Sequence, residues 1–191
     1  MFVEIGYAID RSVAVPDFVC EGLEGKFCVE ATSVNPAVDA SGKLIPPPPT
    51  DTPEQMLAYQ RDYMPIRYSR PLMAKLKKEY WKHAHVAGKP LLFAIQDFHA
   101  AGSMRTTRTA LPNYLYGYFH NWHHEADGTL TITPVKINEH HWENKKVPSG
   151  FFFQPGAENV SAVIYNNSAT ISKFNRMGLL ADFGSKRVRI A

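Results

Sequence analysis

Two short apolar runs near the start of the chain, residues 14–20 and 26–32, predict a β-hairpin. The turn-forming stretch Glu21-Gly22-Leu23-Glu24-Gly25 joins them, and apolar runs that flank such a turn are typical of paired antiparallel strands. Each run carries a single acid, Asp17 in the first and Glu30 in the second. If residues 22–25 form the loop, Glu21 faces Lys26 and Asp17 falls directly opposite Glu30, on the same face of the hairpin.

The opposed pair of acids indicates a metal site. The other face of the hairpin would collect the apolar side chains suited to a core, namely Phe18, Cys20, Phe27, Val29 and Ala31. Two carboxylates whose Cβ atoms lie roughly 5 Å apart repel each other, and a divalent cation between them relieves that repulsion. The alternative is a pair of acids on the wet face of a half-exposed sheet, since a register shift of one residue would separate them.

Further along, the pattern predicts helices followed by a buried strand. Residues 1–11 suit a short helix that carries Glu4, and Thr52-Pro53-Glu54-Gln55 combines an N-cap, a proline at the first helical position and a capping-box glutamine. That second helix is expected to end near Tyr63, before Pro65. A third helix is predicted from Pro71 to about His85, because apolar positions recur there every four residues.

Three later segments read as strands. Residues 90–99 are almost continuously apolar and end in polar residues that include Gln96, as expected of a central strand buried on both faces. Residues 129–133 and 160–165 alternate or are rich in β-branched side chains, which also favours strands. The whole pattern predicts one α/β domain over residues 1–191, with a central mixed β-sheet flanked by helices.

Composition narrows the class of protein. The chain has 191 residues, 45% of them hydrophobic and 20% charged, and a net charge of +3, values ordinary for a globular domain. No run approaches the eighteen or so apolar residues of a membrane span, and no secretory signal is evident. Cys20 and Cys28 are expected on opposite faces of the hairpin and therefore unpaired, which fits a reducing cytoplasm. We expect a cytoplasmic protein without membrane contact.

The order of elements, with Pro16-Asp17 and Glu30-Ala31-Thr32, resembles the PD-(D/E)XK nuclease-like superfamily. In that fold an αβββαβ core places an Asp on one strand and an (Asp/Glu)-x-Lys on the next. The matching core spans roughly residues 1–100, with a C-terminal extension over about 101–191. Residues 3–11, 88–91, 94–99 and 173–178 also look like segments of uncharacterised bacterial proteins.

The resemblance implies a restriction-endonuclease-like core that binds Mg²⁺ or Mn²⁺ through Asp17 and Glu30 and hydrolyses phosphodiester bonds in nucleic acid, with DNA the superfamily's usual substrate. Where the family places its lysine, this chain has Thr32. Threonine cannot supply a charge, although its hydroxyl faces the same way as Glu30 and could donate to a phosphate or a water. Gln96 could hold a water if its strand neighbours Glu30, and Glu4 could contact the ion through water or pair on a helix surface.

Basic residues outside the acid pair are candidates for nucleic-acid contact. They are Lys75, Lys78, Lys82, Lys173 and Arg176, which could make sequence-independent contacts to phosphates. The substitution of Thr32 for lysine leaves open a second reading, a catalytically inactive nuclease-fold module that binds nucleic acid or a protein partner. A larger complex or a homodimer is compatible with either reading.

The histidines support a third hypothesis, a zinc site. Candidate ligands lie at His120, His124 and His140, with glutamates nearby. If residues 120–124 were helical, His120 and His124 would share one face at the spacing that zinc peptidases use. The glutamate that follows the first histidine in such enzymes is absent, and Asp127-Gly128 marks a turn just beyond. A polar, aromatic-rich surface is the simpler interpretation of this region.

Overall fold

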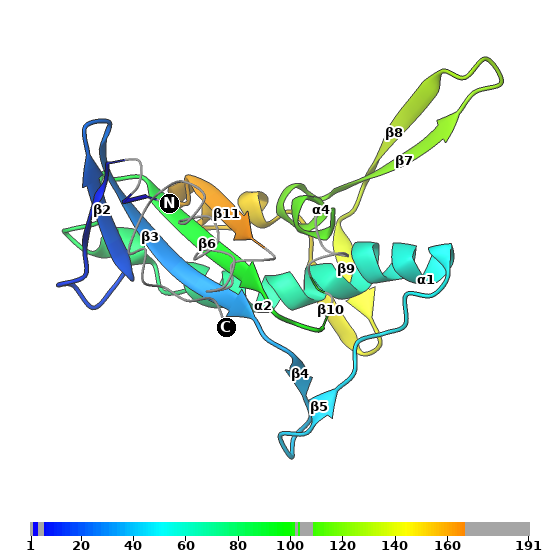
Figure 1. Ribbon diagram of the computed structural model, residues 1–191, viewed down its shortest axis with the longest axis horizontal. Coiled ribbons are helices and arrows are strands. Elements are labelled where there is room, and N and C mark those ends of the chain that lie inside the picture. The colour runs from blue at the N-terminus through cyan, green and yellow to red at the C-terminus, as the bar shows by residue number, and fades with distance from the viewer. Residues whose placement is uncertain (1, 4–5, 102, 104–108, 167–191) are drawn as a thin grey trace, which may run out of the picture.

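A five-stranded mixed β-sheet forms the centre of the molecule. In the computed structural model, which describes residues 2–3, 6–101, 103 and 109–166, the strand order is β1-β2-β3-β6-β11. β1, β2 and β3 pair antiparallel, whereas β3, β6 and β11 run parallel. Their bounds are Ala8–Asp10, Phe18–Gly22, Gly25–Val34, Leu91–Asp97 and Ala162–Asn166. The predicted α/β class with a central mixed sheet is confirmed (Figure 1).

The N-terminal segment differs from its prediction. Residues 8–10 form strand β1, which pairs with β2, and not part of a helix. A strand is the better use of these residues because it gives the edge of the β2–β3 hairpin a hydrogen-bonding partner. Glu4 lies outside the described residues.

One long helix packs across the sheet. It begins at Pro53 as α1 (Pro53–Ala58), continues through a π-helical segment (Tyr59–Tyr63) and ends as α2 (Met64–Leu76). The predicted N-terminus is confirmed: the Thr52 side chain accepts a hydrogen bond from the backbone N–H of Gln55, within a complete capping box. The predicted break before Pro65 is wrong. Because Pro65 has no N–H, it cannot donate a hydrogen bond to the carbonyl of Arg61. His140 Nδ1 bonds this carbonyl instead, at 2.7 Å.

The third predicted helix, Pro71 to about His85, is also wrong in its limits. Pro71 lies inside α2, and the helix stops at Leu76. Glu79 then adopts a left-handed conformation with φ 50°, and Tyr80–Lys82 form a single 3-10 turn. This turn buries Tyr80, which is 1% exposed, against the ring of Phe93 in the sheet.

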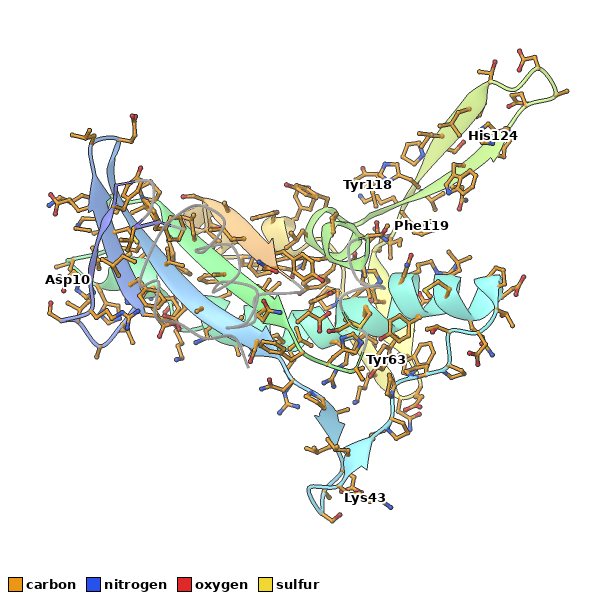
Figure 2. The ribbon with its side chains drawn as sticks, viewed as in Figure 1. Asp10, Lys43, Tyr63, Tyr118, Phe119 and His124 are labelled. Atoms are coloured by element: carbon orange, nitrogen blue, oxygen red, sulfur yellow. The ribbon has the colours of Figure 1, made fainter. Side chains whose placement is uncertain are left out.

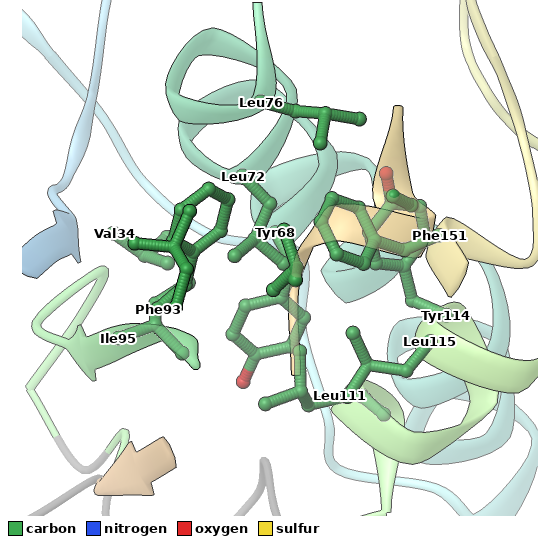
Figure 3. Close-up of a cluster of buried hydrophobic side chains, with 14 of the residues drawn as sticks. Val34, Tyr68, Leu72, Leu76, Phe93, Ile95, Leu111, Tyr114, Leu115 and Phe151 are labelled. Carbon is green, nitrogen blue, oxygen red and sulfur yellow. The ribbon is translucent and has the colours of Figure 1, made fainter. Parts of the chain in front are cut away.

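The main hydrophobic core lies between one face of the sheet and the helices. Figure 3 shows side chains from β3 and β6 meeting those of α2, of α4 (Ala110–Tyr116) and of the 3-10 turn Phe151–Phe153. The labelled members are Val34, Tyr68, Leu72, Leu76, Phe93, Ile95, Leu111, Tyr114, Leu115 and Phe151.

The face of the hairpin that packs on this core is not the predicted one. Cys28 and Val34 of β3 point into the core cluster, and residues spaced by two share a face of a strand, so Glu30 lies on this inner side. The opposite face is covered as well, since Phe27 contacts the rings of Phe2 and Tyr7. The prediction was wrong because both faces of β3 are buried. The more apolar face was therefore no guide to which face packs on the main core.

The remaining strands of the described ranges form three small two-stranded sheets. The β7–β8 hairpin extends away from the body, with side chains such as Tyr118 and His124 along it (Figures 1 and 2). The pairs are β4 (Ala37–Val38) with β5 (Leu44–Ile45), β7 (Tyr118–His124) with β8 (Leu130–Lys136), and β9 (Glu139–Trp142) with β10 (Lys145–Pro148). The strands predicted at 129–133 and 160–165 are confirmed in β8 and β11. No helix in the described part of the chain is long and apolar enough to cross a membrane.

Candidate active site

The hairpin brings Asp17 and Glu30 together. Its predicted register is confirmed, with Glu21 paired to Lys26 and Phe18 paired to Val29. Asp17 precedes β2 by one residue and therefore lies beside Glu30. The backbone N–H of Asp17 donates to Glu30 Oε2 at 3.1 Å, and the backbone N–H of Ala31 donates to Asp17 Oδ2 at 2.7 Å. Each carboxylate thus accepts a hydrogen bond from the main chain at or next to the other acid.

Glu30 is a buried carboxylate with three donors. Its residue is 2% exposed, a position in which an ionised group is stable only when it is paired and hydrogen-bonded. Besides the N–H of Asp17, Glu30 receives the hydroxyl of Tyr80 on Oε1 at 2.6 Å and the ammonium of Lys75 on the same oxygen. Burial, and then the hydrogen bond to Glu30, raise the pKa of Tyr80, so its hydroxyl remains a donor at neutral pH.

The lysine on Glu30 comes from helix α2. Lys75 is 45 residues away from Glu30 along the chain, and its side chain is 20% exposed. Sequence reasoning assigned Lys75 to nucleic-acid contact and missed this pairing. The available signal was its place in the helix, next to Leu76 and three residues after Leu72, which puts a charge at the edge of the buried stripe. Thr32 is half-buried on β3, two residues beyond Glu30 and on the same face.

Gln96 does not join this site, contrary to the prediction. In the parallel register Glu30 pairs with Phe93, and Gln96 pairs with Ser33. Since side chains alternate between faces, a residue three positions after Phe93 points to the opposite face of the sheet. The side-chain amide of Gln96 donates to the carbonyl of Asp97 at 3.2 Å.

The other basic candidates lie at different places. Lys82 pairs with Glu79 at 2.7 Å on the surface, and the Lys78 ammonium lies 5.9 Å from the centre of the Tyr80 ring. Both follow α2 and lie close in sequence to Tyr80, whose hydroxyl reaches the acid pair. Lys173 and Arg176 lie outside the described residues, as does Glu4.

The histidines do not form the helical pair that the zinc hypothesis requires. His120 and His124 lie on strand β7 of the projecting hairpin, while His140 is buried and bonds Ser149 Oγ at 2.7 Å as well as the carbonyl of Arg61. Burial lowers the pKa of His140. Within the described ranges, no group of three or more His, Cys, Asp or Glu side chains is arranged to hold a metal ion.

A second buried polar cluster escaped sequence reasoning. Asp97, 0% exposed at the end of β6, accepts both the backbone N–H of His99 at 3.0 Å and its ring Nδ1 at 2.6 Å. Tyr68 donates to the other carboxylate oxygen at 3.0 Å, and the Tyr59 hydroxyl contacts His99 Nε2. The sequence signal for this cluster was the group of polar residues that ends the apolar run 90–99. The cluster ties β6 to the long helix at its π segment.

Comparisons with protein-family models, with curated proteins and with solved structures return no match for the chain. The resemblance to PD-(D/E)XK nucleases therefore stays a prediction that depends on the residues above. Chemically, the site offers an exposed carboxylate on Asp17, a buried carboxylate on Glu30 and an ammonium on Lys75. Such a set can bind a divalent cation and orient a water or a phosphate.

Proposed function

We propose that the protein is a metal-dependent phosphodiester hydrolase that acts on nucleic acid, DNA in the first instance, from a restriction-endonuclease-like core. The observation that carries the proposal is the convergence of Asp17, Glu30 and Lys75 from three separate elements. Two acids and a lysine are the residue types that the superfamily's motif supplies. Here the lysine comes from a helix, and its charge supports the proposal at a site where Thr32 supplies none.

The donor set suits a Mg²⁺ or Mn²⁺ ion. Asp17 Oδ1 accepts no hydrogen bond from the described residues, and Glu30 Oε2 accepts only the N–H of Asp17, so both carboxylates keep oxygen lone pairs for a ligand. Mg²⁺ is usually held by one or two carboxylates together with waters and substrate phosphates. When bound, such an ion lowers the pKa of a coordinated water and offsets charge on phosphate oxygens.

The protein's own groups would then divide the work of orientation. Tyr80 and the N–H of Asp17 hold Glu30 in place from two sides. Lys75 is a fifth exposed, so its ammonium can exchange part of its contact with Glu30 for a hydrogen bond to the attacking water or to a phosphate oxygen. Thr32 can donate its hydroxyl from the same face of β3.

A nicking assay tests the proposal. Purified protein is incubated with supercoiled plasmid and, in parallel, with single-stranded RNA, in Mg²⁺ or in Mn²⁺. Wild type is expected to cleave plasmid, and Asp17→Asn, Glu30→Gln and Lys75→Met to lose at least about 100-fold in rate. The matched controls are Glu21→Gln and Lys26→Met, which break an exposed ion pair on the same hairpin and should leave the rate unchanged.

Two results would contradict the proposal. Cleavage that survives both Asp17→Asn and Glu30→Gln in folded protein would assign the activity to another site or to a contaminant. Salt-dependent DNA binding that persists in EDTA, with no cleavage by wild type under any metal, would favour the inactive binding module.

A further inference from the structure

A basic groove lies beside the acid pair. It is an open cavity of about 710 Å³ between α2, the C-terminal end of β3 and strand β10. Four of the residues that line it are cationic, and none is acidic: the cations are Arg67, Arg70, Lys145 and Lys146. A concave surface lined by one sign of charge concentrates ligands of the opposite sign, so the groove selects an anion.

Most of these cations have no acidic partner in the described part of the chain. Lys146 pairs with Glu139 at 2.6 Å, but among the described residues neither Arg70 nor Lys145 forms an ion pair. Arg67 donates from one terminal nitrogen to the carbonyl of Asn35, while its Nε is buried and has no hydrogen-bond partner. A buried donor without a partner is costly, and Arg presents its N–H groups in a fork that matches phosphate oxygens.

The groove is lined by further residues of β3 and α2, the two elements that carry Glu30 and Lys75. Lys75 of α2 contacts Glu30, and Arg67, eight residues earlier on the same helix, contacts Asn35 just beyond β3. Eight helical residues span about 12 Å, and β3 covers about 10 Å from Glu30 to Ser33 at the groove. Since duplex DNA rises about 3.4 Å per base pair along its axis, an offset of this size along that axis would span roughly three base pairs.

From this arrangement we infer that the groove binds the phosphate backbone of a nucleic acid on one side of the bond held at Asp17 and Glu30. The inference rests on the proposed function and deepens it, because it assigns the flanking phosphates to Arg67, Arg70 and Lys145. An acidic protein segment would also meet the charge, but the groove is lined by β3 and α2, the two elements that carry Glu30 and Lys75, and this favours the strand of nucleic acid that the proposed reaction would cut.

The test measures binding apart from cleavage. Anisotropy of a labelled duplex of about 30 base pairs is titrated in Ca²⁺ over a series of salt concentrations with Glu30→Gln protein, which would bind but not cut. The exposed residues Arg70 and Lys145 are replaced by Gln together. Loss of two phosphate contacts should flatten the slope of log K against log salt by about 1.8 and weaken binding up to ~60-fold at 0.1 M salt. The control is Lys26→Gln with Lys136→Gln, an equal change of charge at two exposed lysines outside the groove.

The outcomes separate the groove from the reaction. If the Arg70/Lys145 double variant keeps the slope and affinity of the control, the groove inference is overturned, even when wild type cleaves DNA. If wild type shows no cleavage but the double variant alone loses affinity, the groove stands and the hydrolase proposal fails. Tighter competition by poly-glutamate than by duplex of equal charge would also overturn the inference, in favour of a protein ligand.

Discussion

Replacing Lys75 with methionine tests whether the ion pair with Glu30 holds the site together. The substitution keeps an unbranched side chain, one atom shorter, and removes its charge. Glu30 is 2% exposed and Lys75 has a side chain that is 20% exposed. Breaking a buried pair typically costs 3–5 kcal/mol. Because Tyr80 and the N–H of Asp17 remain as donors to Glu30, we expect the lower end, about 3 kcal/mol.

Urea denaturation of a double-mutant cycle provides the measurement. Lys75→Met should lower the free energy of unfolding by about 3 kcal/mol, which is roughly 6–12 °C in Tm for a domain of this size. Glu30→Gln alone should also destabilise, but the double variant should be less destabilised than the sum of the two single variants. The difference, a coupling energy of at least about 1.5 kcal/mol, reports the interaction. Lys82→Met, which removes an exposed ion pair with Glu79, should stay within about 0.5 kcal/mol of wild type.

Two results would refute this reasoning. Additive losses in the cycle would mean that Lys75 and Glu30 do not interact in solution. A Lys75→Met protein as stable as the Lys82→Met control would mean that Glu30 is satisfied without the ammonium, and that Lys75 is free to act only on a ligand.

Three further predictions concern other parts of the fold. Asp97→Asn should cost about 2–4 kcal/mol in urea denaturation, because His99 donates to one carboxylate oxygen and Tyr68 to the other, and an amide has an acceptor oxygen at only one of these positions. Burial lowers the pKa of His140, so below about pH 6.5 the unfolded chain binds a proton that the folded protein does not bind. The free energy of unfolding should therefore fall as pH falls below that value, with a slope of at most about 1.4 kcal/mol per pH unit. This part of the pH profile of Tm should vanish in His140→Asn. Gly117→Ala should lower Tm by the equivalent of about 1–2 kcal/mol, since Gly117 has φ +71° and an added Cβ would lie 3.2 Å from the carbonyl oxygen of Ile137. The control is Gly128→Ala on the projecting hairpin, where φ is also positive but an added Cβ would have no atom within 4 Å. Its loss of stability measures the conformational part of the effect alone.

Local features of the fold were readable from the sequence. The β2–β3 hairpin and its register follow from a short turn between two apolar runs, and the capping box at Thr52 follows from a four-residue signature. Both depend on residues that are neighbours along the chain. The proximity of Asp17 to Glu30 belongs to the same class, because a hairpin fixes it without help from the rest of the fold.

What depends on tertiary packing was not readable. The helix passes through Pro65 because His140, far along the chain, supplies a partner for the carbonyl that the proline leaves. Gln96 was misplaced because its face depends on the register between β3 and β6. That register pairs Glu30 with Phe93, so Gln96, three residues later, lies on the other face of the sheet. Lys75 was assigned only to nucleic-acid contact, because its distance from Glu30 is set by how α2 lies on the sheet.

Because this lysine comes from α2, the site depends on the packing of that helix against the sheet. An ammonium on the same hairpin as the acids would stay near them whenever that hairpin is formed. In this protein it reaches Glu30 only while Leu72 and Leu76 are packed in the core. Any local opening that lifts the end of α2 from the sheet would therefore remove the charge from Glu30 before the hairpin itself unfolds. Competence of the site would then follow the docking of one helix, and would be lost at a lower temperature than the β2–β3 hydrogen bonds.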